Sequence, residues 1–154
     1  MRRSEKEVKD IHEIESILKR ANICRIGLCD DNIPYVVPMN YGYRDNSLYL
    51  HSAKEGRKID IIRENSNVCF EVETDTELVE GGDIACKWGM KFISVIGYGK
   101  ARIIDNRNQK KKALGIFMDQ YTKGKELIFQ DKEIDAVLVI EIVIDDISCK
   151  KSGY

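Results

Sequence analysis

Short apolar runs separated by tight polar turns constrain this chain more than any other feature of its sequence. The runs at 23–29, 33–43 and 48–53 are rich in β-branched and aromatic residues, and only 30–32 and 44–47 separate them. Connections this short join antiparallel neighbours, because a parallel pair needs a crossover of about a dozen residues or more. This part of the sequence therefore predicts consecutive antiparallel strands rather than a doubly wound sheet.

The remainder of the chain adds three more strand-like segments, at 67–73, 91–104 and 136–144. The last of them, AVLVIEIVI, is apolar at nearly every position, which is typical of a strand covered on both faces. Six strands joined mostly by short turns predict a mainly β protein of the α+β class. We expect an antiparallel β-barrel with peripheral helices.

Apolar residues at helical spacing predict three peripheral helices, at about 5–20, 53–64 and 106–123. The first begins with an S-x-x-E capping box formed by Ser4 and Glu7. The polar stretch 75–88 is expected to be a loop. No repeat, linker or low-complexity segment divides the sequence, so 1–154 is expected to form a single domain.

Composition argues against several classes of protein. The formal net charge is −1 and both signs are mixed along the chain, which disfavours a nucleic-acid binder that relies on bulk positive charge. No segment approaches the roughly 20 apolar residues of a membrane span, and no apolar stretch follows the N-terminal MRRSEKEVKD as in a secretory signal. We therefore expect a cytoplasmic protein.

Five cysteines occur without a CxxC pair, so the sequence predicts neither a metal site nor a disulfide framework. Cys24, Cys29 and Cys69 lie in strand-like runs and are expected to be small buried hydrophobic residues.

The stretch HSAKEGRKIDIIREN, which starts at His51, gathers hydrogen-bonding and cationic side chains at the start of a predicted helix. The first N–H groups of a helix have no internal partner and favour anions. Arg57 can add a bidentate fork and Lys58 a point charge, while His51 and Ser52 can donate further hydrogen bonds. Gly56 lets the backbone or a ligand approach closely. The pattern indicates a seat for a phosphate group.

A second interpretation stays open at this point. Ser52-x-x-Glu55 is itself a capping box, so Ser52 can simply cap its own helix. Arg57 and Lys58 would then be solvated, and His51 would be an ordinary strand histidine.

Two prolines, Pro34 and Pro38, interrupt the run 33–43 and predict an edge, a bulge or a kink with free backbone groups. This run is expected to pair with 48–53, one hairpin later. A planar heterocycle needs donors and acceptors at its edge and apolar contact on its faces. Next to a phosphate seat, such a strand indicates a phosphorylated aromatic cofactor.

The segments PYVVPMNYGY, LYLHSAKEGRKIDIIRENSNVCFEV and SVIGYGKARII resemble the FMN-binding split-barrel flavoproteins related to pyridoxamine 5′-phosphate oxidase. Within that group the sequence is most similar to the nitroimidazole-resistance proteins. The resemblance covers about 5–144. It implies a six-stranded antiparallel split β-barrel that forms a homodimer, with FMN at the subunit interface.

The resemblance also assigns nine residues to FMN. Its phosphate would be held by His51, Ser52, Arg57 and Lys58, its isoalloxazine ring would be bordered by Pro38, Met39, Asn40 and Tyr41, and Trp88 would reach the flavin of the other subunit.

The function expected from this resemblance is that of an FMN-dependent oxidoreductase. Electrons would pass from NADH or NADPH through the flavin to a small acceptor, of which a nitroaromatic such as a 5-nitroimidazole is one candidate. The C-terminal DDISCKKSGY lacks an arginine-rich motif for a pyridoxal-type substrate. The alternatives are a flavin-binding sensor or store without turnover, and a split barrel that binds haem through His51 or serves as an interaction module.

Overall fold

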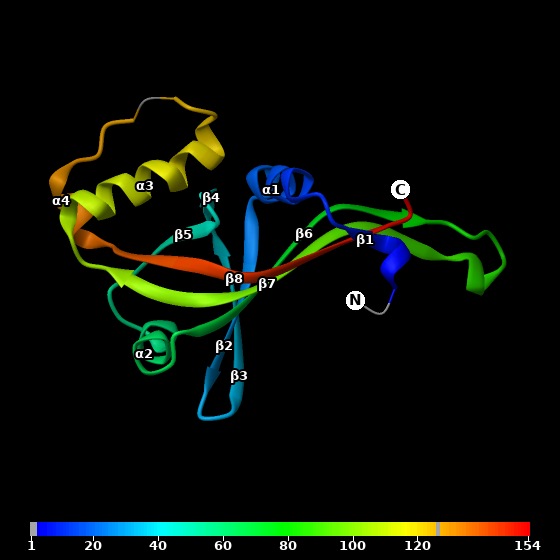
Figure 1. Cartoon of the computed structure of the whole chain (residues 1–154), viewed down its shortest axis with the longest axis horizontal. Coiled ribbons are helices and arrows are strands. Elements are labelled where there is room, and N and C mark those ends of the chain that lie inside the picture. The colour runs from blue at the N-terminus through cyan, green and yellow to red at the C-terminus, as the bar shows by residue number, and fades with distance from the viewer. Residues whose placement is uncertain (1–2, 126) are drawn as a thin grey trace.

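One curved antiparallel sheet organises the molecule, which is described by a computed structural model for residues 3–125 and 127–154 (Figure 1). The sheet order is β3-β2-β6-β7-β8-β5-β4, and β1 pairs with β8. The strands are β1 Glu7–Val8, β2 Ile23–Asp30, β3 Ile33–Asn40, β4 Gly42–Arg44, β5 Ser47–Ser52, β6 Asn67–Val79, β7 Gly89–Ile104 and β8 Leu138–Ser152.

In the part of the chain that the structure describes, four α-helices lie around this sheet: α1 Ile11–Arg20, α2 Arg57–Glu64, α3 Arg107–Thr122 and α4 Asp131–Ala136. In Figure 1, α3 and α4 lie at one end of the long strands β6, β7 and β8, and the arm formed by β6 and β7 extends to the other end. Within the described residues, each helix is too short or too polar to span a bilayer.

The chain passes directly from one edge of the sheet to the other. Strand β3 lies at one edge and β4 at the opposite edge, although only Tyr41 separates them in sequence. The sheet therefore curves until its two edges approach each other without pairing along their length. This arrangement confirms a mainly antiparallel split barrel with helices, and the described residues form eight strands rather than six because β1 and β4 are short additions.

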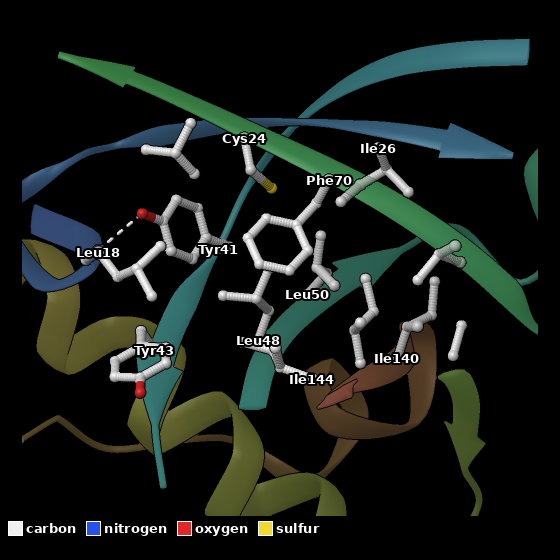
Figure 2. Close-up of a cluster of buried hydrophobic side chains, with 14 of the residues drawn as sticks. Leu18, Cys24, Ile26, Tyr41, Tyr43, Leu48, Leu50, Phe70, Ile140 and Ile144 are labelled. Carbon is white, nitrogen blue, oxygen red and sulfur yellow. Dashed lines mark hydrogen bonds between the residues drawn. The ribbon is translucent and has the colours of Figure 1, made fainter. Parts of the chain in front are cut away.

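Alternating side chains fill the interior of the barrel. In β2, Cys24, Ile26 and Leu28 face inward, and they meet Phe70 from β6 and Leu50 from β5 (Figure 2). A smaller cluster lies between the opposite face of the sheet and helices α3 and α4; it contains Ile104, Ala113, Leu114, Ile134 and Val139. The segment 138–142 is thus buried on both faces, as its apolar sequence predicts.

The N-terminal helix is shorter than predicted. It begins at Ile11, where the side chain of Asp10 accepts a hydrogen bond from the backbone N–H of His12 at 2.9 Å. The predicted capping box at Ser4 does not start this helix, because Ser4–Lys6 form only a short 3-10 turn and Glu7 and Val8 then pair with β8. The strand ladder occupies the backbone groups that a longer helix would need.

The prediction of a loop at 75–88 is wrong for residues 75–79, whereas its end at residue 88 is confirmed. Strand β6 continues to Val79 and β7 begins at Gly89, so the two strands form an extended hairpin arm. The last strand likewise runs beyond 144 to Ser152, which pairs with Phe92. Exposed strands need no alternating apolar residues, because backbone hydrogen bonds hold the arm together.

The predicted pairing of 33–43 with 48–53 holds only at its end. Strand β3 pairs with β2 over its whole length, whereas β4 alone pairs with β5. The prolines Pro34 and Pro38 do lie on an edge strand, as predicted. Cys29, in contrast, is exposed, because it lies on the outer face of β2 while Cys24 faces the core; all five cysteines are free thiols.

Candidate functional site

The junction between β5 and α2 has the backbone geometry of an anion seat. Gly56 adopts φ 123°, which turns the chain from the strand into the helix and favours glycine. No side chain caps α2, so the alternative capping box of Ser52 and Glu55 is wrong. The eight-residue helix therefore begins with N–H groups that no side chain satisfies, at the positive end of its dipole.

Ser52 supplies a second and independent feature of this junction. The residue is only 6% exposed, and its Oγ is buried without a hydrogen-bond partner among the described residues. Buried hydroxyls nearly always have a partner, since leaving one unsatisfied costs about 1–3 kcal/mol. A hydroxyl in this state is suited to donate a hydrogen bond to an acceptor atom of a bound ligand.

The two cations that follow Gly56 have different surroundings. Arg57 is exposed; its guanidinium lies 3.4 Å from a carboxylate oxygen of Asp30 and 4.9 Å from the ring centre of Tyr35. Lys58 is half-buried and lines the narrow apolar gap between β3 and β5, beside Val37 and Leu50. Sequence reasoning missed Asp30 and Tyr35, although both lie in the hairpin that it predicted.

His51 lies on the opposite face of β5 from Ser52. Successive strand residues point to opposite faces, and the His51 ring contacts Phe117 of α3 edge-on, with a centroid distance of 4.6 Å and an interplanar angle of 82°. It borders an apolar hollow of about 160 Å³, whose other lining residues are Leu114, Phe117, Met118, Phe129, Glu133, Ile134 and Val137. The residue is exposed overall, and its partial burial against α3 lowers the pKa of the imidazole. The structure does not bring this imidazole together with the Ser52 hydroxyl.

The segment Pro38, Met39, Asn40 and Tyr41 ends strand β3 beside the split. Pro38 and Asn40 are exposed, whereas Met39 packs against the core. Tyr41 is fully buried, and its hydroxyl donates to the carbonyl of Leu18 at 2.6 Å (Figure 2). Its side chain is therefore part of the core rather than of an exposed surface.

Tyr121 of α3 holds the strand break in place. Its hydroxyl accepts from the backbone N–H of Tyr41 at 2.9 Å, and it has the carbonyls of Tyr41 and Asn22 as further partners at 2.9 Å. The backbone of Tyr41 is thus already hydrogen-bonded, which leaves 38–40 as the part of this segment with an open edge. The sequence, which predicts a helix over 106–123, gives no sign of this role for Tyr121.

Trp88 lies far from the other candidate residues of the same chain. It directly precedes β7 at the outer end of the arm, on the other side of the molecule from α2 (Figure 1). Its side chain is 46% exposed, and Nε1 donates to the carbonyl of Gly82 at 2.9 Å. Nowhere in the described residues do three or more histidine, cysteine or acidic side chains gather in a way that could hold a metal ion.

Comparisons with known proteins agree with this architecture. The family model for pyridoxamine 5′-phosphate oxidase matches residues 10–151. A structure from Bacteroides thetaiotaomicron, described as a candidate 5-nitroimidazole antibiotic resistance protein, is 34% identical with a TM-score of 0.82, and the alignment covers 94% of this chain and 85% of that one. An uncharacterised protein of Rhizobium meliloti is 33% identical over 60 residues, which is 39% of this chain and 39% of that protein.

Two further structures are similar in fold at lower sequence identity. A flavocytochrome from Azotobacter vinelandii is 24% identical with a TM-score of 0.83, covering 100% of this chain and 72% of that one. A protein from Mycobacterium smegmatis that binds FAD and haem is 18% identical with a TM-score of 0.85, covering 97% and 74%. With the family model matched from residue 10 to residue 151 and the split sheet in place, the chain belongs to the pyridoxamine 5′-phosphate oxidase family.

Proposed function

We propose that this protein is an FMN-dependent oxidoreductase that holds the flavin phosphate where β5 meets α2. The observation that carries the proposal is the buried, unpartnered hydroxyl of Ser52 beside a helix start that no side chain caps. A phosphate monoester offers three acceptor oxygens and a negative charge, which suit both a hydroxyl donor and free helix N–H groups.

Each residue at the junction has a distinct part in this proposal. Arg57 contributes a fork of donors from the exposed side, and Lys58 contributes a compact charge from the half-buried side. The open edge at Pro38, Met39 and Asn40 would border the ring of the cofactor, and Tyr121 keeps the adjoining strand break rigid. His51 was also expected at the phosphate, yet its side chain faces α3. It would therefore contact the phosphate through its backbone, or contact another group of the cofactor.

Bound FMN would supply the redox chemistry, which takes electrons from NADH or NADPH and passes them to a small acceptor. A nitroaromatic such as a 5-nitroimidazole is the acceptor we propose to try first, supported by the 34% identity to the Bacteroides thetaiotaomicron protein. The chain itself binds and orients the cofactor. Its apolar walls at Val37 and Leu50 keep water from the inner side of the seat.

The test is a titration of the purified protein with FMN, followed by flavin fluorescence. We expect replacement of both Arg57 and Lys58 by alanine to weaken binding by about 100-fold, because each removes a charge-assisted contact. Arg63→Ala is the matched control, since Arg63 lies at the other end of α2 and pairs with Asp60. Equal affinity for FMN in the wild type and the double variant would place the phosphate elsewhere.

Turnover is tested separately from binding. Anaerobic mixing of the FMN-loaded protein with NADH or NADPH should bleach the flavin absorbance, and a 5-nitroimidazole should restore it. A protein that binds FMN but stays oxidised with both donors would be a flavin sensor or store rather than a reductase.

Haem binding is a second candidate function, favoured by the position of His51. Partial burial lowers the pKa of the imidazole, which borders an apolar hollow between α3 and α4, a combination that suits an axial ligand to iron. Titration with haemin should then give a sharp Soret band that His51→Ala abolishes. A spectrum of free haemin with the wild type would exclude this candidate.

A further inference from the structure

The hairpin that joins β2 to β3 reaches the proposed phosphate seat. Asp30 is the last residue of β2 and pairs with Ile33 across a two-residue turn. Its carboxylate lies 3.4 Å from a terminal nitrogen of Arg57, and the ring of Tyr35 lies under the same guanidinium at 4.9 Å. Arg57 thus contacts both strands of this hairpin.

These two contacts affect Arg57 differently. The Tyr35 ring holds the guanidinium by its face and leaves its N–H groups free to donate. The Asp30 carboxylate uses those N–H groups, and a phosphate oxygen would need the same ones. A carboxylate next to the seat also repels an incoming dianion.

We propose that Asp30 is an affinity-determining residue: its carboxylate competes with a phosphate monoester for Arg57 and thereby weakens binding. This inference rests on the proposed function, because it concerns the same phosphate seat. The Arg57 and Asp30 side chains are 53% and 41% exposed, so their pair is weak and a phosphate can displace it. The Tyr35 ring gives Arg57 a second contact that does not involve Asp30.

Asp30→Asn is the direct test, because it keeps the shape of the side chain and removes its charge. We expect FMN to bind about two- to fivefold more tightly, as judged from the range of exposed ion pairs. Riboflavin, which lacks the phosphate, should bind as it does to the wild type. The gain for FMN should shrink as salt is raised.

Asp31→Asn is the matched control. Asp31 is the next residue, loses the same charge, and has φ 45°, a conformation that asparagine adopts readily. It lies beside the same hollow as Asp30 but makes no contact with Arg57 among those that the described residues show. If Asp30→Asn weakens FMN binding, or changes it no more than Asp31→Asn does, the inference is overturned.

A double-mutant cycle separates the effect of the Asp30–Arg57 pair on FMN affinity from other effects of the Asp30 charge. In an Arg57→Ala background, Asp30→Asn should change FMN affinity no more than Asp31→Asn does. An undiminished gain in that background would mean that Asp30 acts on the ligand alone, which also overturns the proposal. Failure of the wild type to bind FMN would overturn the proposed function itself, whereas normal FMN binding without the Asp30 effect would overturn only this inference.

Discussion

At the scale of single residues, Ser52 links stability to binding. Its buried hydroxyl has no partner among the described residues, so Ser52→Ala removes an unsatisfied polar group. We expect the free energy of unfolding to stay unchanged or to rise by up to about 1 kcal/mol, while FMN affinity falls about tenfold or more. Denaturant titration and flavin fluorescence measure the two quantities.

A neighbouring serine provides the control for that variant. Ser47 is also buried in β5, and among the described residues its hydroxyl is not one of those left buried without a hydrogen-bond partner. Ser47→Ala should therefore lower stability and leave FMN affinity as it is. Loss of stability in Ser52→Ala would show that its hydroxyl is satisfied within the protein.

His51 makes stability depend on pH. Burial lowers its pKa in the folded protein, whereas the unfolded chain keeps the ordinary value of about 6.5. The unfolded state therefore binds more protons at low pH, and the free energy of unfolding should fall as the pH drops through about 6.5. His51→Gln should flatten this part of the profile in urea titrations, with His12→Gln as control. An unaltered slope in His51→Gln would contradict the expectation.

At the scale of elements, the contact between β4 and α3 fixes the break after β3. A Cβ added to Gly42 would lie 2.5 Å from the Cα of Phe117 and 2.6 Å from the carbonyl oxygen of Ile116. These are backbone atoms of a helix and cannot move aside singly. We expect Gly42→Ala to destabilise the fold by about 3 kcal/mol in a thermal or denaturant melt.

Gly115 offers a matched comparison within α3 itself. A Cβ there would meet nothing within 4 Å. Gly115→Ala should therefore stabilise the protein by about 0.5–1 kcal/mol, through helix propensity alone. If both variants had the same stability, close packing of α3 on β4 would not be what holds the strand break.

At the scale of the whole molecule, a row of exposed apolar side chains crosses part of the outer face of the sheet. The register aligns Val36, Gly27, Cys69 and Tyr98 in one row across β3, β2, β6 and β7. Val36 is 62% and Tyr98 55% exposed, and Ile96 beside them is 41% exposed. A surface of this kind is typical of an interface, and we propose that a second copy of the chain covers it.

Sedimentation at micromolar concentration tests this assembly. The wild type should sediment as a dimer, and Tyr98→Lys should shift it towards the monomer by burying an unpaired charge. Ile128→Lys is the control, because Ile128 is 93% exposed and lies outside this row. A wild type that stays monomeric would contradict the proposed dimer. It would also contradict the proposed contact between Trp88 and a partner's flavin.

Much of the local structure could be predicted from the sequence, because its causes are local. Backbone chemistry within a few residues accounts for the turns at 30–32 and 44–47 and for the edge position of Pro34 and Pro38. The opposite orientations of His51 and Ser52 also follow from strand alternation, which the prediction of a joint phosphate contact overlooked.

The sequence by itself determined an antiparallel, turn-linked β protein with a cationic helix start after β5. The tertiary structure alone decided that β3 pairs with β2, that Asp30 and Tyr35 meet Arg57, and that Ser52 is left without a partner. The physical reason is range: turns, caps and alternation depend on neighbours in the chain. Strand partners and buried hydrogen bonds depend instead on segments that only packing brings together.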